Sequence, residues 1–157
     1  MRAATLVLSI IVCQAVGLLG ARWTAPQIAG WYATLRKPSF NPPNWVFGPV
    51  WTLLYLLMAI AVWRVMQLGP SPARNLALAL FVLQLALNFA WTPLFFRFHL
   101  LRSALAEIVV VWLAIGATTV VFARVDAAAA WMMAPYWAWV TFATALNAGI
   151  AWLNPKA

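Results

Sequence analysis

With 157 residues, of which 66% are hydrophobic and 8% charged, this chain is too apolar to fold as a soluble globule, because soluble domains are about 45–50% apolar and leave much of their surface in water. The net charge of +8 does not indicate a nucleic-acid-binding protein: the basic residues form no cluster larger than Arg36–Lys37, and phosphate tracking needs a contiguous basic face. A disulfide-stapled secreted domain is excluded because Cys13 is the single cysteine.

Five apolar stretches are long enough, or nearly so, to cross a bilayer as helices, which takes about 20 residues each. They cover approximately residues 4–21, 45–66, 76–96, 103–123 and 129–153. Charged residues bracket them, from Arg2 and Arg22 around the first to Asp126 and Lys156 around the last. The sequence therefore predicts an all-α integral membrane protein whose residues 1–157 form one domain, a bundle of five transmembrane helices in a lipid bilayer.

The first stretch could instead be a signal peptide, with Arg2 ahead of an apolar core. Signal cleavage needs small residues at positions −3 and −1. Leucine occupies position −3 for either cut near Gly20 and Ala21, which favours a retained helix.

The connections between the stretches are short apart from the first, residues 22–44, which we expect to be an ordered loop with a function of its own. Five crossings place the termini on opposite sides of the membrane. The side of the N-terminus carries four basic residues and the other side six; the six are Arg22, Arg36, Lys37, Arg97, Arg102 and Lys156. The positive-inside rule then predicts a cytoplasmic long loop and C-terminus.

The inventory of catalytic groups is small: two carboxylates, one histidine and one cysteine. No metal-ligand cluster or Ser/His/Asp arrangement can be assembled from it, so the sequence predicts no metal site and no required cofactor, and it disfavours a hydrolase. Glu107 has two interpretations. An ionisable group inside a membrane span is a functional candidate, whereas the simpler interpretation is that Glu107 snorkels to the surface or pairs with Arg102.

Three stretches carry aromatic and amide residues on one helical face each. These faces comprise Gln84, Asn88, Trp91 and Phe95 in the third stretch, Trp139, Ala143 and Asn147 in the fifth, and Trp51, Tyr55 and Met58 in the second. Buried amides often do no more than join helices by hydrogen bonds. Three such faces together indicate a cavity for a flat, mostly apolar ligand.

Several motifs recur in register with a known family. They are Trp31-Tyr32, Leu35-x-Lys37-Pro38, Pro42-Pro43-x-Trp45, Trp51-x-x-x-Tyr55, Asn88-x-x-Trp91-x-Pro93-x-Phe95-Phe96, and Pro135-Tyr136-x-x-Trp139 followed by Phe142-Ala143-Thr144 and Asn147. The chain resembles, over nearly its whole length, the tryptophan-rich sensory protein/translocator protein (TspO, peripheral benzodiazepine receptor) family.

The resemblance implies a five-helix bundle, commonly dimeric, that binds porphyrins, haem-type tetrapyrroles, sterols and benzodiazepine-type ligands in a cavity under the first loop. It implies that Trp139 faces Trp51. The sterol-contact pattern described at the end of the fifth helix in animal members is absent, because no tyrosine stands between Leu146 and Lys156.

From the residues and the resemblance together we expect a receptor, sensor or transporter-like protein of the bacterial inner membrane that binds porphyrins. In it, prolines stiffen loop 22–44 into an aromatic lid, and Arg36, Lys37 and Asn88 meet the ligand's carboxylates. The expected ligand-binding residues are Trp31, Lys37, Pro42, Pro43, Trp45, Trp51, Tyr55, Asn88, Trp91, Trp139, Ala143 and Asn147.

Two other functions remain open. The resemblance also admits an enzyme that degrades protoporphyrin IX with light and oxygen, with Trp51 and Trp139 as its catalytic residues. A purely structural bundle would bind no ligand saturably. A homodimer is expected from small residues that allow close helix approach, in Cys13-x-x-x-Gly17-x-x-x-Ala21 and Ala86-x-x-x-Ala90.

Overall fold

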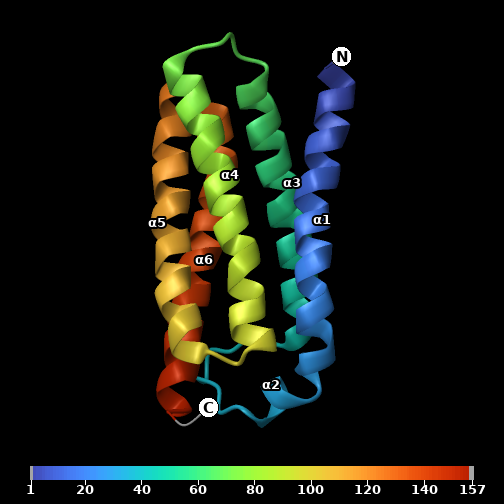
Figure 1. Cartoon of the computed structure of the whole chain (residues 1–157), viewed down its shortest axis with the longest axis vertical. Coiled ribbons are helices and arrows are strands. Elements are labelled where there is room, and N and C mark those ends of the chain that lie inside the picture. Colours follow the sequence, from blue (N-terminus) through green and yellow to red (C-terminus); the bar gives the residue numbers. More distant parts are fainter. Residues whose placement is uncertain (1, 156–157) are drawn as a thin grey trace.

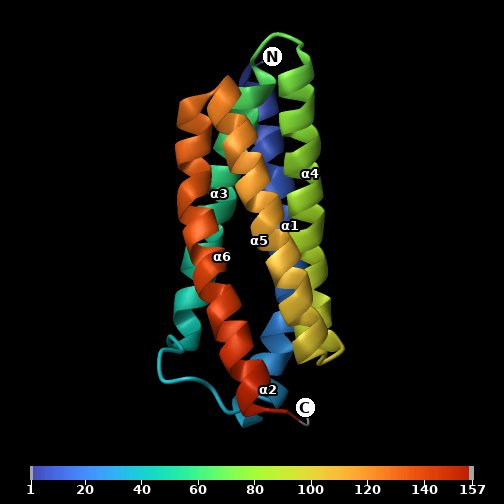
Figure 2. The same ribbon diagram turned by 90° about the vertical axis from the view of Figure 1, so that its left-hand side faces the viewer.

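The computed structural model describes residues 2–155, and Lys156, one of the basic residues counted above, lies outside them. Five long helices run side by side in an elongated bundle, with the described ends of the chain at opposite ends of it (Figures 1 and 2). They are α1 (Arg2–Ile28), α3 (Phe47–Met66), α4 (Pro72–Thr92), α5 (Leu101–Val125) and α6 (Ala127–Leu153). A four-residue helix, α2 (Trp31–Thr34), lies in the first loop, and no strand occurs among the described residues.

Four of the described helical segments are long and apolar enough to cross a membrane: Arg2–Ile28, Asn44–Met66, Pro72–Arg97 and Leu101–Val125. The chain is thus an integral membrane protein. The fifth predicted stretch corresponds to α6, which matches the others in length but is not among these four segments. The prediction of five spans is confirmed only as far as four membrane-capable helices.

The first helix runs beyond the predicted boundary at Arg22 and ends at Ile28. Packing explains the difference: the Trp23 ring lies against Phe89 of α4 with 5.4 Å between centroids, while Arg22 stays exposed. Pro26 lies in the last turn, where its missing N–H removes one hydrogen bond to the preceding turn, and the helix ends two residues later. The loop expected at 22–44 is therefore shorter, and α2 forms inside it.

Side-chain caps and prolines set the remaining boundaries. Ser71 caps α4 by accepting a hydrogen bond from the Arg74 N–H, and Pro72 follows it at the first helical position, where proline is favoured. At the other end, Pro93 opens a π-helical turn, η2 (Pro93–Arg97), because its ring removes an intrahelical hydrogen bond.

Asp126 alone separates α5 from α6. Its carboxylate accepts a hydrogen bond from the Ala129 N–H at 3.1 Å and pairs with Arg64 of α3 at 3.0 and 3.2 Å. It therefore caps α6 and ties α3 to the sharpest turn of the bundle.

We predict that Asp126→Ala lowers the free energy of unfolding by about 1–2 kcal/mol, from the lost cap and a partly exposed ion pair. Burial alone would raise the pKa of the Asp126 carboxyl, but the hydrogen bonds from Ala129 and Arg64 and the Arg64 charge outweigh burial and lower it. Because the pKa is lower in the folded chain, the stabilisation is complete above the unfolded-state pKa and is lost as the pH falls through the folded-state value.

The control for this prediction is Asp126→Asn, which keeps a good helix cap but removes the charge. Thermal unfolding in detergent, followed through the acid range, should show a smaller loss of stability for Asp126→Asn than for Asp126→Ala. In both variants the stability should depend less on pH than in the wild type. An Asp126→Asn profile that parallels the wild type would contradict the role of the ion pair.

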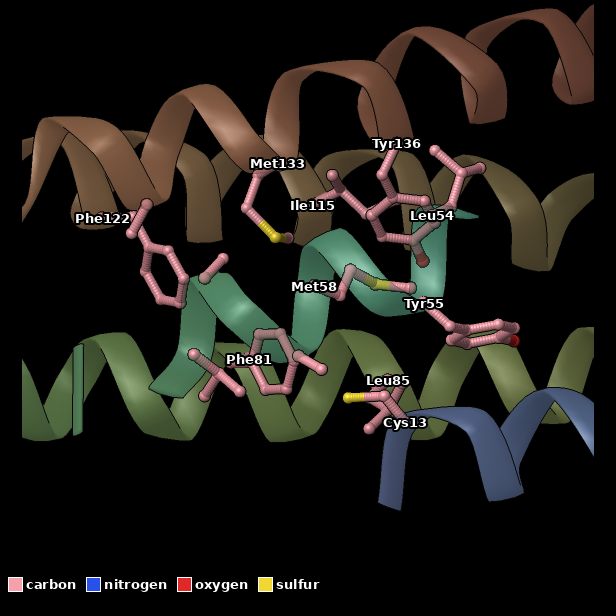
Figure 3. Packing of buried hydrophobic residues seen from close by; sticks show 14 of the residues in the cluster. Cys13, Leu54, Tyr55, Met58, Phe81, Leu85, Ile115, Phe122, Met133 and Tyr136 are labelled. Atoms are coloured by element: carbon pink, nitrogen blue, oxygen red, sulfur yellow. The ribbon is translucent and has the colours of Figure 1, made fainter. Parts of the chain in front are cut away.

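The core is divided into two clusters, one towards each end of the bundle. The first cluster extends from the middle of the bundle towards the end that holds the start of α1. Its fully buried members include Met58, Ile115, Phe122, Met133 and Tyr136 (Figure 3). The other lies under the loop, around Phe95, Leu101, Leu146 and Ile150, with Tyr32 and Leu35 added from the loop. Residues of both clusters line a cavity between them.

Candidate functional site

A cavity of about 360 Å³ lies inside the loop-side half of the bundle, within the range of about 300–1,000 Å³ that is usual for small-molecule sites. Its walls come from all five long helices and from α2. The lining is mostly apolar and includes Phe47, Trp51, Tyr55, Asn88, Trp91, Phe95, Trp139, Ala143, Leu146 and Asn147.

Three tryptophans form aromatic walls of this cavity. Trp51 lies beside Tyr55, with 5.5 Å between ring centroids, and meets Tyr136 edge-on at 6.1 Å. Trp139 packs against Phe47 at 5.8 Å and Phe142 at 5.2 Å, and its indole N–H has no hydrogen-bond partner within residues 2–155. Both indoles line the same cavity, with different aromatic neighbours.

Trp137 and Trp139 lie about 200° apart around α6, so only one of them can face the cavity. The structure places Trp139 there and packs Trp137 against Trp112 of α5 at 5.4 Å.

Asn88 is the centre of a hydrogen-bond network in the cavity wall. Its side-chain oxygen accepts from the Tyr55 hydroxyl at 2.8 Å, and its NH₂ group donates to the Tyr136 hydroxyl at 2.8 Å. All three side chains are buried. The network joins α3, α4 and α6 at one point, and it includes Tyr136, which was not among the predicted ligand-site residues.

A second amide, Asn147, fixes the third tryptophan. Its oxygen accepts from the Trp91 indole N–H at 3.1 Å, and its NH₂ group donates to the Leu101 carbonyl at 3.1 Å. Trp91 also stacks on Phe95, with 5.0 Å between centroids. Asn88 and Asn147 therefore join helices by hydrogen bonds and also line the cavity. The structural interpretation of these amides and the ligand-site interpretation are compatible.

Helix α1 contributes a wall that the sequence analysis did not assign to the site. The lining residues on it are Gln14, Gly17, Leu18, Gly20, Ala21, Thr24 and Ile28. Gly17 contacts the Tyr55 ring and Gly20 lies against Thr92, while Cys13 is buried. Cys13, Gly17 and Ala21 were interpreted together as a face for dimer contact; Cys13 and Gly17 instead pack inside the bundle, whereas Ala21 is exposed. Ala86 and Ala90 are exposed.

We predict that Gly17→Ala lowers the free energy of unfolding by about 1–3 kcal/mol, the usual cost of overpacking. An added Cβ would lie 2.7 Å from Cε2 of Tyr55, and that ring cannot swing away without breaking its hydrogen bond to Asn88. The measurement is thermal unfolding in detergent. Gly48→Ala is the matched control, because nothing lies within 4 Å of its added Cβ; equal midpoints for the two variants would contradict the prediction.

The segment between α1 and α3, residues 29–46 and called the lid below, closes the loop end of the cavity. Tyr32 lines the cavity and donates to the Asn41 side-chain oxygen at 3.1 Å. Trp31 stacks on His99 with 3.8 Å between centroids and 15° between planes; His99 has a φ of 57°, a conformation uncommon outside glycine.

The lid is also fastened to α6. The Asn154 side chain accepts from the Arg36 backbone N–H at 3.0 Å and donates to the Arg36 carbonyl at 2.8 Å. Pro38 packs so closely on Gly149 that a Cβ there would lie 3.0 Å from the proline ring. These contacts hold the part of the lid from Trp31 to Pro38 to the bundle.

Five of the expected ligand-binding residues lie on the lid but not in the cavity wall: Trp31, Lys37, Pro42, Pro43 and Trp45. Trp45 is 75% exposed. Lys37 lies 4.6 Å from the centroid of the Tyr32 ring and donates to the Leu35 carbonyl at 3.1 Å; burial lowers the pKa of its ammonium group. Trp51, Tyr55, Asn88, Trp91, Trp139, Ala143 and Asn147 do line the cavity.

Two polar groups in the spans lie apart from this site. Gln84 is fully buried on α4, and its amide has no hydrogen-bond partner among the residues that the structure describes. In the described part of the chain the Glu107 carboxylate likewise has no hydrogen-bond partner, so of the interpretations given for Glu107, pairing with Arg102 does not occur.

These features define a helical membrane protein with a lidded aromatic cavity inside its bundle. Comparison with known proteins is specific: the sequence pattern of the TspO/MBR family matches residues 9–153. The chain belongs to the TspO/MBR family, as its motifs indicated.

Three relatives show the range of this similarity. The chain is 41% identical over 152 residues to the tryptophan-rich protein TspO of Chlorobaculum tepidum, covering 96% of each chain. It is 40% identical over 146 residues to protein CrtK of Rhodobacter capsulatus, covering 92% of this chain and 89% of the relative. It is 41% identical over 133 residues to the human translocator protein, covering 82% of this chain and 78% of the relative.

Proposed function

We propose that the protein is a membrane receptor or transporter-like protein that binds porphyrins and related tetrapyrroles in the cavity of the bundle, with no other cofactor required. The observation that carries the proposal is the wall of three indoles, Trp51, Trp91 and Trp139, around one largely apolar cavity. A porphyrin presents a broad π-face, and aromatic rings stack favourably on such a face. Benzodiazepine-type ligands share that flat aromatic character; sterols share only the apolar surface.

The test is quenching of tryptophan fluorescence by protoporphyrin IX in nanodiscs. Trp131 and Trp152 are exposed, so replacing both by phenylalanine removes a background signal from outside the bundle. We expect saturable quenching with about one porphyrin per chain, as for a single enclosed site. Quenching that rises linearly without saturation would refute the proposal and favour a purely structural bundle.

A second candidate function is an enzyme that degrades the bound porphyrin with light and oxygen. It is favoured by the position of Trp51 beside two tyrosines, at 5.5 Å from Tyr55 and 6.1 Å from Tyr136, because all three side chains can pass single electrons. The complex would be illuminated and the porphyrin followed by absorbance in wild type, Trp51→Phe and Trp139→Phe. Loss that ends at one equivalent per chain, or that persists in both variants, would exclude an enzyme.

We further propose that α6 is a fifth span, since it packs against α5, side by side near the turn that joins them and diverging towards the loop end (Figure 2), and that the protein resides in a bacterial inner membrane. The loop end of the bundle carries Arg22, Arg36, Lys37, Arg97 and Arg102, whereas one of the four arginines at the other end, Arg64, is paired with Asp126. By the positive-inside rule, this excess of unpaired basic residues favours a cytoplasmic loop and C-terminus. The exposed Ala86 and Ala90 would suit a homodimer contact.

A further inference from the structure

A ligand that binds in this cavity needs a way in, and the loop end is closed. The lid is held there by the Trp31–His99 stack, by two hydrogen bonds between Asn154 and the Arg36 backbone, and by the packing of Pro38 on Gly149. The opposite end of the cavity abuts the main core cluster around Met58 and Tyr136 (Figure 3). Neither end of the bundle is open without breaking these contacts.

The side of the cavity differs from its ends. Most of its lining residues are buried or half-buried, and the exposed ones are Leu18, Ala21, Gly48 and Thr52. All four lie on α1 or α3, which are packed side by side (Figure 1). The cavity therefore reaches the outer surface of the bundle along the seam between these two helices.

The seam between α1 and α3 is closed on the side away from the loop and open on the side nearer the loop. The Gln14 side chain donates to the Thr52 carbonyl at 3.0 Å, and Gly17 lies directly against the Tyr55 ring. Towards the loop, Ala21 and Gly48 provide no side chain large enough to bridge the helices, and nothing lies within 4 Å of a Cβ added at Gly48. Leu18, 71% exposed, is the bulkiest side chain at this opening.

The surroundings of the opening suit an amphiphile dissolved in the membrane. Leu19 and Leu53 beside it are exposed apolar residues, as expected for a surface in contact with hydrocarbon. Arg22 follows Ala21 and is exposed, and an arginine near a helix end reaches the headgroup region. A carboxylated ring system in the loop-side leaflet could place its carboxylates near the Arg22 guanidinium. Its apolar edge would then face the opening between α1 and α3.

We propose that the seam between α1 and α3, at Leu18, Ala21, Gly48 and Thr52, is a lateral portal through which a flat, anionic, membrane-dissolved ligand passes between the bilayer and the cavity. The proposal rests on the proposed function, because it concerns how the same cavity is filled. The four residues are the exposed edge of the cavity lining, so altering them should change the rates of entry and exit together, and by a larger factor than the equilibrium affinity.

The experiment measures association and dissociation of protoporphyrin IX by stopped-flow fluorescence in nanodiscs. Gly48→Leu adds a side chain in the gap and should slow both rates by about tenfold, equivalent to ~1.4 kcal/mol of added barrier. Leu18→Ala widens the gap and should speed both. Gly69→Leu is the matched control: an added Cβ at Gly69 also meets nothing within 4 Å, but Gly69 lies in the α3–α4 turn at the far end of the bundle.

A second measurement separates the bilayer from the water as the source of ligand. The association rate should follow the mole fraction of porphyrin in the lipid and not its concentration in the buffer. Gly48→Leu rates equal to those of Gly69→Leu, with quenching intact, would overturn the portal alone, and so would a rate that ignores the lipid mole fraction. Absence of saturable quenching in the wild type would overturn the proposed function and the portal with it.

Discussion

Replacing both Trp51 and Trp139 by alanine should weaken protoporphyrin IX binding about a hundredfold, because each aromatic contact is worth up to about 1.5 kcal/mol beyond its buried area. Both indoles line the cavity, from the neighbouring helices α3 and α6. Their removal takes away two stacking walls and leaves a wider, less complementary space. The affinity would be measured by equilibrium titration of the porphyrin Soret absorbance, which does not depend on the number of tryptophans.

The matched control is the double variant Trp131→Ala and Trp152→Ala, which removes two tryptophans of the same helix α6 that are 77% and 85% exposed. Its affinity should equal that of the wild type. An unchanged affinity in the Trp51/Trp139 variant, or an equal loss in the control, would remove the assignment of the porphyrin to this cavity.

Asn88→Leu should destabilise the protein by about 2–5 kcal/mol, since two buried tyrosine hydroxyls each lose a partner at about 1–3 kcal/mol apiece. Asn88 is 7% exposed, and its single amide satisfies Tyr55 and Tyr136 together. The same change should lower porphyrin affinity, because Tyr55 and Asn88 form part of the cavity wall. Chemical unfolding in mixed micelles and the Soret titration measure the two effects.

Two further variants separate the hydrogen bonds from the change of side chain. Asn75→Leu alters an exposed asparagine of the same helix and should leave stability nearly unchanged. Removing both tyrosine hydroxyls along with the amide, by Tyr55→Phe, Tyr136→Phe and Asn88→Leu, should recover much of the lost stability, because no buried polar group is then unpaired. A triple variant that is less stable than Asn88→Leu would contradict the role of the network.

Much of the site could be predicted from helical spacing. The positions Asn88, Trp91 and Phe95, and likewise Trp139, Ala143 and Asn147, share one face of a helix because they recur at intervals of three and four residues, and the structure brings both faces to one cavity. Spacing does not say what lies across from a face. Hence Tyr136 was not connected to Asn88, and the small residues of α1 were assigned to a dimer contact when Gly17 packs on Tyr55.

The sequence by itself determined that this is a helical membrane protein of the TspO/MBR family, because apolar length, the placement of charges and the spacing of tryptophan and proline motifs are properties of the chain alone. Only the tertiary structure decided which helices meet. It placed Trp45 on the exposed surface of the lid, fastened Arg36 to Asn154, and left Ala21 and Gly48 facing a gap between α1 and α3. These depend on how residues far apart in sequence pack together, and no local pattern encodes that register.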